Sequence, residues 1–129
     1  MSTPHLPPDV PVAPVPDRTV PLVRDLGVAA GHRVHLLSLE VWPGFADLRF
    51  ARVDEGGGAT LKRRVPPAAA WSVHVDGTPV EVWEAVGRGD RRFSNGEVRL
   101  RPAPPAGATV RVAVQLTPDA PPLQAEVTA

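Results

Sequence analysis

The chain has 129 residues and no cysteine. This length fits one domain, and the lack of thiols excludes disulfides, iron–sulfur clusters, thiolate zinc sites and cysteine nucleophiles. Fourteen basic side chains balance fourteen acidic ones, and the nine basic against five acidic side chains of residues 59–115 are too small an excess to predict a nucleic-acid partner. No run of about 18 apolar residues is present, so no membrane span is expected. The N-terminus lacks the pattern of a secretory signal peptide, and we therefore expect a cytoplasmic protein.

Proline marks both ends of the chain. Seven prolines fall within residues 1–21. Because proline fixes φ and cannot donate a backbone hydrogen bond, residues 1–17 are predicted to form an extended proline-rich arm, either a docking peptide or a tether. Residues 118–129, which also begin proline-rich, are predicted to form a C-terminal tail. The folded domain is then expected at residues 18–117.

Between these ends, apolar and polar residues alternate with a period of two. Residues 108–116 are the clearest case, because every second side chain from Val110 onward is Val or Leu. Residues 71–75 alternate likewise and place Trp71 on an apolar, buried face, and Asp76-Gly77 after them is a strong tight-turn signal. Such alternation is typical of half-buried strands.

Further strands are predicted at 33–42 and 45–53, joined by a turn at Pro43-Gly44, and at 80–86. A second hairpin is predicted around Asn95-Gly96, a favoured type I′ turn. Weaker signals suggest strands at 20–23 and 61–65 and a helical turn within 22–30.

Seven or eight short strands separated by turn signals predict an all-β fold, a two-sheet immunoglobulin-like sandwich with a proline-rich N-terminal arm. A sandwich is preferred to a barrel because the proline-rich segments 66–67 and 102–105 are interpreted as crossings between two sheets.

Three segments, residues 36–45, 73–78 and 100–107, carry an aromatic-Pro-Gly-Phe turn, an Asp-Gly-Thr turn and a Pro-x-Pro-Pro-x-Gly segment. In these features the chain resembles a set of uncharacterised actinobacterial β-sandwich proteins of unknown function. The resemblance covers about residues 33–116. It implies a β-sandwich and brings no activity with it.

No catalytic, cofactor-binding or metal-binding residue is predicted. His32 and His35 stand three apart, so on one strand they face opposite ways, and with His74 they are expected to be surface histidines. Pairs of strand carboxylates are expected by chance among fourteen acids, and no serine lies in a Gly-x-Ser-x-Gly motif.

Four residues are candidates for binding a partner. Trp83 faces away from its valine neighbours and is either an exposed anchor or a core residue. Arg88, Arg91 and Arg92 cluster in a predicted loop, and arginine suits carboxylate or phosphate contacts.

These observations favour a non-enzymatic protein-interaction or binding module that docks through a strand edge, a sheet face or loops. Its partner is expected to be another protein or further copies of the chain. One alternative is a structural subunit of a larger assembly, such as a shell, tail or filament. The second alternative is a hydrolase or metal-dependent enzyme.

Overall fold

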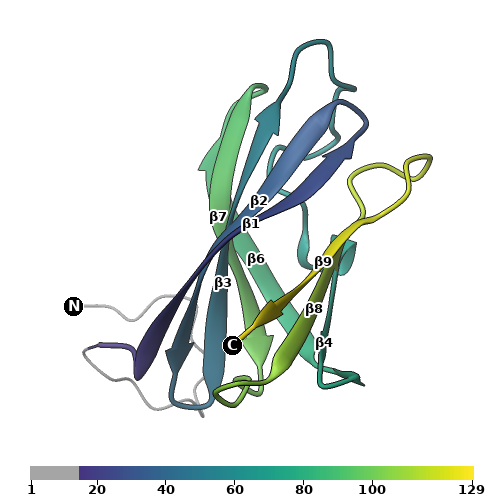
Figure 1. Ribbon diagram of the computed structural model, residues 1–129. Coiled ribbons are helices and arrows are strands. Elements are labelled where there is room, and N and C mark those ends of the chain that lie inside the picture. Colours follow the sequence, from purple (N-terminus) through teal and green to yellow (C-terminus); the bar gives the residue numbers. More distant parts are fainter. Residues whose placement is uncertain (1–14) are drawn as a thin grey trace.

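Two antiparallel sheets pack face to face in the computed structural model, which describes residues 15–129 (Figure 1). The first sheet has the order β1-β2-β3-β7-β6 and the second the order β5-β4-β8-β9. The strands are β1 (Arg18–Ala29), β2 (His32–Trp42), β3 (Phe45–Asp54), β4 (Trp71–Val75), β5 (Thr78–Pro79), β6 (Glu81–Gly89), β7 (Phe93–Arg101), β8 (Thr109–Val114) and β9 (Leu123–Thr128). The predicted all-β sandwich is confirmed, with nine strands in the described residues.

The chain changes sheets at three places. Residues 55–70 join β3 to β4 and contain a single 3₁₀ turn, Ala68–Ala70. Val80 joins β5 to β6, and residues 102–108 join β7 to β8. The two proline-rich segments at 66–67 and 102–105 therefore lie on sheet crossings, as predicted.

Side chains that alternate along the strands fill the space between the sheets. Phe50 on β3 meets Trp71 on β4 with ring centroids 4.9 Å apart, and this contact joins the two layers. Val110, Val112 and Val114 on β8 are fully buried. Alternation along residues 108–116 thus predicted the buried face of β8 correctly, because a strand turns successive side chains to opposite faces.

Strand β1 replaces the expected short strand and helical turn. It runs continuously from Arg18 to Ala29 beside β2, with register shifts between Pro21 and Arg24 and between Asp25 and Gly27. Backbone pairing with β2 supplies the hydrogen bonds that a helical turn within 22–30 would have made locally. The bulges absorb the unusual backbone of this strand, where Val23 has a φ of 45°.

The second hairpin turns at Asp90 and not at Asn95-Gly96. Asn95 and Gly96 lie within the continuous strand β7. Asp90 Oδ1 accepts hydrogen bonds from the backbone N–H groups of Arg92 and Phe93, at 2.8 and 3.0 Å, and this Asx turn reverses the chain. Gly96 lies opposite Gly87, where a Cβ atom would overlap the carbonyl oxygen of Val86. The glycine therefore serves close strand approach.

Two predicted segments have different structures from those expected. Residues 61–65 are not a strand but part of the crossing loop between β3 and β4. The segment predicted as a tail contains β9, which pairs along its whole length with β8.

Most of the predicted arm lies outside the described residues, although the N–H of Asp17 donates to the carbonyl of Val41 at 2.7 Å. Within residues 15–129 no helix is long and apolar enough to cross a membrane.

Candidate functional site

The four candidate partner-binding residues do not form one site. Trp83 and Arg88 lie on β6 at the edge of the five-stranded sheet. Arg91 and Arg92 lie in the turn between β6 and β7. The arginines are exposed, and Arg88 borders a hollow of about 700 Å³ beside the exposed ring of Phe93. The molecule therefore presents two regions, the β6 edge and the end of the sandwich.

Trp83 belongs to an aromatic cluster on the outer face of the five-stranded sheet. Its ring meets the edge of Phe45 at 5.8 Å, and Phe45 stacks on Trp42 at 6.1 Å. The guanidinium of Arg101 lies 5.2 Å from the Trp83 ring centre, a cation–π contact. Trp83 is half-buried, so it is neither the fully exposed anchor nor the core residue that the sequence left open.

A charge network covers the middle of the same face. Arg99 donates to Asp47 at 3.2 Å, pairs with Glu84, and lies 3.8 Å from Glu97. Burial raises the pKa of Asp47 to about 6. The negative charge of Glu97 also raises this pKa, whereas the positive charge of Arg99 lowers it. This part of the outer face is therefore already internally paired.

The four sheet edges differ in how open they are. Bulges and Pro21 interrupt β1, which also contacts β9 across the side of the sandwich (Figure 1). Strand β5 has two residues. Strand β6 has nine, and within the described chain it pairs with β7 on one side and with no strand on the other. No backbone hydrogen bond joins β6 to any described segment besides β7.

At the end of the sandwich, a buried arginine joins three segments. Arg52 faces inward on β3 and is 1% exposed. Its Nε donates to the carbonyl of Arg64 at 3.1 Å and to Ser94 Oγ at 3.0 Å, and its two Nη atoms donate to the carbonyls of Arg91 at 3.2 Å and Asp90 at 2.7 Å. Burial lowers the pKa of Arg52. One guanidinium thus fixes both the crossing loop and the β6–β7 turn.

His32 completes this cluster. Its Nδ1 lies 2.9 Å from Arg52 Nη1, and its Nε2 lies 2.6 Å from the carbonyl oxygen of Ala59. Because a guanidinium can only donate, Nδ1 accepts, and Nε2 carries the proton that is donated to Ala59. His32 is buried, so the expectation of a surface histidine was wrong for this residue.

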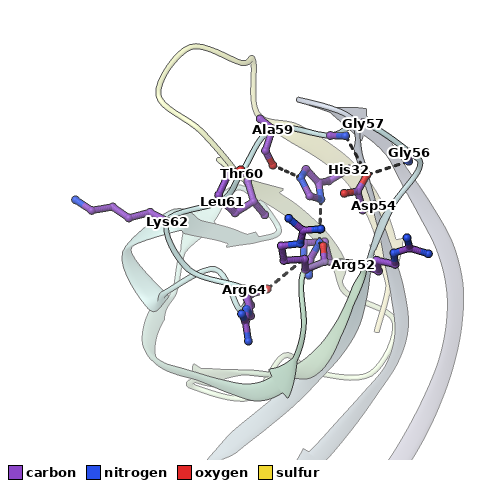
Figure 2. Close-up of a pocket in the computed structure, with 13 residues that line it drawn as sticks. His32, Arg52, Asp54, Gly56, Gly57, Ala59, Thr60, Leu61, Lys62 and Arg64 are labelled. Carbon is purple, nitrogen blue, oxygen red and sulfur yellow. Dashed lines mark hydrogen bonds between the residues drawn. The ribbon is translucent and has the colours of Figure 1, made fainter.

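Between the crossing loop and the turn lies a hollow of about 630 Å³, which we call the basic cleft (Figure 2). Loop residues 56–62 and Arg64 form one wall, and Arg91 and Arg92 contribute to the other. Five cationic side chains line it, namely those of Arg52, Lys62, Arg64, Arg91 and Arg92, against the single carboxylate of Asp54.

The Asp54 carboxylate is occupied by the loop itself. Its Oδ1 accepts from the N–H groups of Gly56 at 2.9 Å and Gly58 at 3.0 Å, and these bonds lower the pKa of Asp54. A Cβ atom on residue 58 would lie 2.9 Å from His32 Nε2. Only glycine therefore fits at this position without displacing the imidazole ring. The Gly56-Gly57-Gly58 segment is therefore a tightly held wall of the cleft.

The remaining histidines lie apart. His35 is on the outer face of the five-stranded sheet, and His74 is on the second sheet. Among residues 15–129, no three His, Cys, Asp or Glu side chains gather closely enough to hold a metal ion.

Sequence reasoning found Arg91 and Arg92 but missed Arg52. A signal existed, since Arg52 continues the inward-facing series Ala46, Leu48 and Phe50 on β3. A charged residue in a buried position needs hydrogen-bond or ion-pair partners, so this pattern predicts a polar cluster around Arg52. Comparisons with family models, curated proteins and solved structures return no match.

Proposed function

We propose that this chain is a non-enzymatic interaction module of immunoglobulin-like type, which assembles by adding strand β6 to strand β6 of a second copy. The observation that carries the proposal is the open edge of β6, because an unpaired strand edge offers a row of backbone donors and acceptors to another strand.

The strand order supports the immunoglobulin-like part. Strands β2-β3-β7-β6 and β5-β4-β8-β9 follow the order A-B-E-D and C′-C-F-G of immunoglobulin sheets, with β1 added at one edge. Trp71 occupies the place of the buried tryptophan of strand C. The chain has no cysteine for the usual disulfide between the sheets, and Phe50 packs on Trp71 in the core.

A non-enzymatic role is supported by how the buried polar groups are used. Arg52 and His32 form hydrogen bonds with backbone carbonyls, with Ser94 and with each other. These contacts hold loops in place, which favours a scaffold over acid–base chemistry.

A second copy fits β6 because the strand is complementary to itself. Glu84, Val86 and Arg88 pair with outward-facing residues of β7 and so share the outer face. In an antiparallel pair centred on Val86, Glu84 of each copy, which also pairs with Arg99 of its own chain, lies opposite Arg88 of the other. Facing side chains in such pairs have Cβ atoms about 5 Å apart, and opposite charges there are favourable.

The geometry favours a closed dimer over a filament. A twofold pairing uses the same edge in both copies, so it consumes the open edge and ends the assembly. Two register shifts interrupt β1, which also contacts β9, whereas β6 has one register shift, between Val82 and Glu84, and is longer than the other edge strands β5 and β9. The alternative of a filament subunit would need a second such edge.

Analytical ultracentrifugation over a concentration series tests the proposal. The wild-type chain should reach a dimer, and Val86→Lys should stay monomeric because two ammonium groups would meet at the twofold axis. The matched control is Val28→Lys, on the opposite edge strand β1, which should dimerise like wild type. A wild-type chain that stays monomeric at nuclear-magnetic-resonance concentrations contradicts the proposal.

Single cysteines report the register, because the chain has none of its own. Val86→Cys should form an interchain disulfide under mild oxidation, since its partner is the same residue of the second copy. Val28→Cys should not. Equal cross-linking of the two variants would show collisions and not a specific pair.

A further inference from the structure

The four outer cations of the basic cleft have no ion-pair partner in the described chain. Within residues 15–129, no carboxylate lies within 4 Å of the cationic groups of Lys62, Arg64, Arg91 and Arg92. Five arginines on the strands form ion pairs, namely Arg33, Arg49, Arg99, Arg101 and Arg111, whereas Arg18, Arg24 and Arg88 form none within the described residues. The basic cleft is thus a concave place where four cations without ion pairs gather.

Nearby carboxylates do not neutralise this charge directly. Asp54 accepts from Gly56 and Gly58, and Asp90 accepts from Arg92 and Phe93, in each case through backbone N–H groups. Both acids therefore fold the loops that carry the cations and do not pair with the cationic side chains.

The cleft is also held in shape before any ligand arrives. Arg52 bonds the carbonyl of Arg64 on one wall and that of Arg91 on the other, and His32 bonds the carbonyl of Ala59. The anchors are backbone carbonyls, so the side chains of Arg64 and Arg91 remain available. Preorganised donors lower the entropic cost of binding.

We infer that the basic cleft binds a compact polyanion of the polyphosphate class. The lining side chains sum to four positive charges, counting five cations against Asp54. A tripolyphosphate group concentrates about as many negative charges in a small volume, whereas a carboxylate supplies one, and arginine forks match phosphate oxygens. The hollow of about 630 Å³ is of the size that holds small ligands.

This inference is independent of the β6 edge. None of the residues that line the cleft belongs to β6. The Val86→Lys variant should therefore bind the polyanion like wild type, and the two proposals can fail separately.

Isothermal titration of the full chain with sodium tripolyphosphate at low ionic strength tests the site. We expect one ligand per chain and an affinity that falls as salt is added. Arg91→Ala and Arg92→Ala should each weaken binding about tenfold, the effect of losing one charge-assisted contact. Their melting temperatures should stay close to wild type, because the backbone carbonyl of Arg91 is kept.

Arg63→Ala is the matched control. Arg63 lies between Lys62 and Arg64 on the same loop, but it does not line the cleft. Its replacement by alanine removes the same charge as Arg91→Ala. It should leave binding within about twofold of wild type. An equal loss in Arg63→Ala and Arg91→Ala would reduce the effect to general attraction and overturn the inference.

Three ligand arms decide the chemical class. Citrate should bind much more weakly than tripolyphosphate. Adenosine triphosphate should bind about as well as tripolyphosphate, because no Phe or Trp of the described residues lines the cleft to hold a base. No detectable tripolyphosphate binding overturns the inference. So does citrate binding of equal strength, or a single-stranded oligonucleotide that binds more tightly through Arg91 and Arg92.

Discussion

Arg52 Nη1 donates a hydrogen bond to Nδ1 of His32 across 2.9 Å, and both side chains are buried. The two residues come from neighbouring strands, β3 and β2, and each continues into a loop contact, Arg52 to the carbonyls of Arg64, Asp90 and Arg91, and His32 to that of Ala59. This inward-facing pair therefore ties the crossing loop and the β6–β7 turn to the strands at this end of the sandwich.

Replacing Arg52 by alanine should destabilise the fold by about 3 kcal/mol or more, because hydrogen bonds to five acceptors are lost and a large cavity forms. Arg52→Lys should recover only part of this, since one ammonium cannot reproduce the planar fork. Urea denaturation measures both. Arg49→Ala, on the outer face of the same strand, should cost less than about 1 kcal/mol. A similar cost for Arg49 and Arg52 would contradict the assigned role of Arg52.

The ring of His32 should carry its proton on Nε2. The guanidinium of Arg52 has no lone pair to offer, so Nδ1 must be the accepting nitrogen. Nitrogen-15 spectra of the imidazole should show an unprotonated Nδ1, and the Nε2 proton should be protected from exchange by Ala59. A proton found on Nδ1 would show that the pair is arranged differently.

Stability should fall as the pH rises from about 4 to about 6, and Asp47 is the cause. Its folded-state pKa of about 6 lies above the ordinary 3.8, so the folded state holds the proton more tightly in this window and loses that advantage as the carboxyl ionises. Asp47→Asn should therefore be more stable than wild type at pH 8, by at most about 3 kcal/mol at 1.36 kcal/mol per pKa unit. The difference should shrink below pH 4.

Asp25→Asn is expected to change the pH dependence of stability in the opposite direction to Asp47→Asn. The Gly27 N–H, with Arg33, lowers the pKa of Asp25, so its carboxylate stabilises the fold above its ordinary pKa, and that stabilisation is lost as the pH falls. This variant should melt lower than wild type at neutral pH and approach wild type in acid. Thermal unfolding across pH 3–8 measures both variants. Parallel pH profiles for Asp25→Asn and Asp47→Asn would refute the assignment.

The turn at Asp90 can be separated from the Asn-Gly pair within β7. Asp90→Ala should lower the melting temperature by a few degrees, because the N–H groups of Arg92 and Phe93 lose their acceptor. Asn95→Ser should be nearly neutral, since Asn95 lies in mid-strand and forms no turn. The reverse ranking would place the turn at Asn95-Gly96.

The sequence by itself determined the sandwich and most of its strands. Alternation at 71–75 and 108–116 predicted buried faces because a strand sends every second side chain inward, and Asp76-Gly77 and Pro43-Gly44 predicted hairpins because their backbones suit tight turns. These are local properties, and the sequence carries them directly.

Only the tertiary structure decided what β1, β9 and Asn95-Gly96 would do, because each depends on a partner strand. Residues 22–30 and 123–128 have weak patterns of their own, and pairing with β2 and β8 turns them into strands. Gly96 is needed because β6 approaches it closely, and this contact cannot be predicted from turn propensities. The basic cleft arises in the same way, since Arg52 hydrogen-bonds the backbone of loop 56–64 and that of Arg91, which lies 39 residues further along the chain.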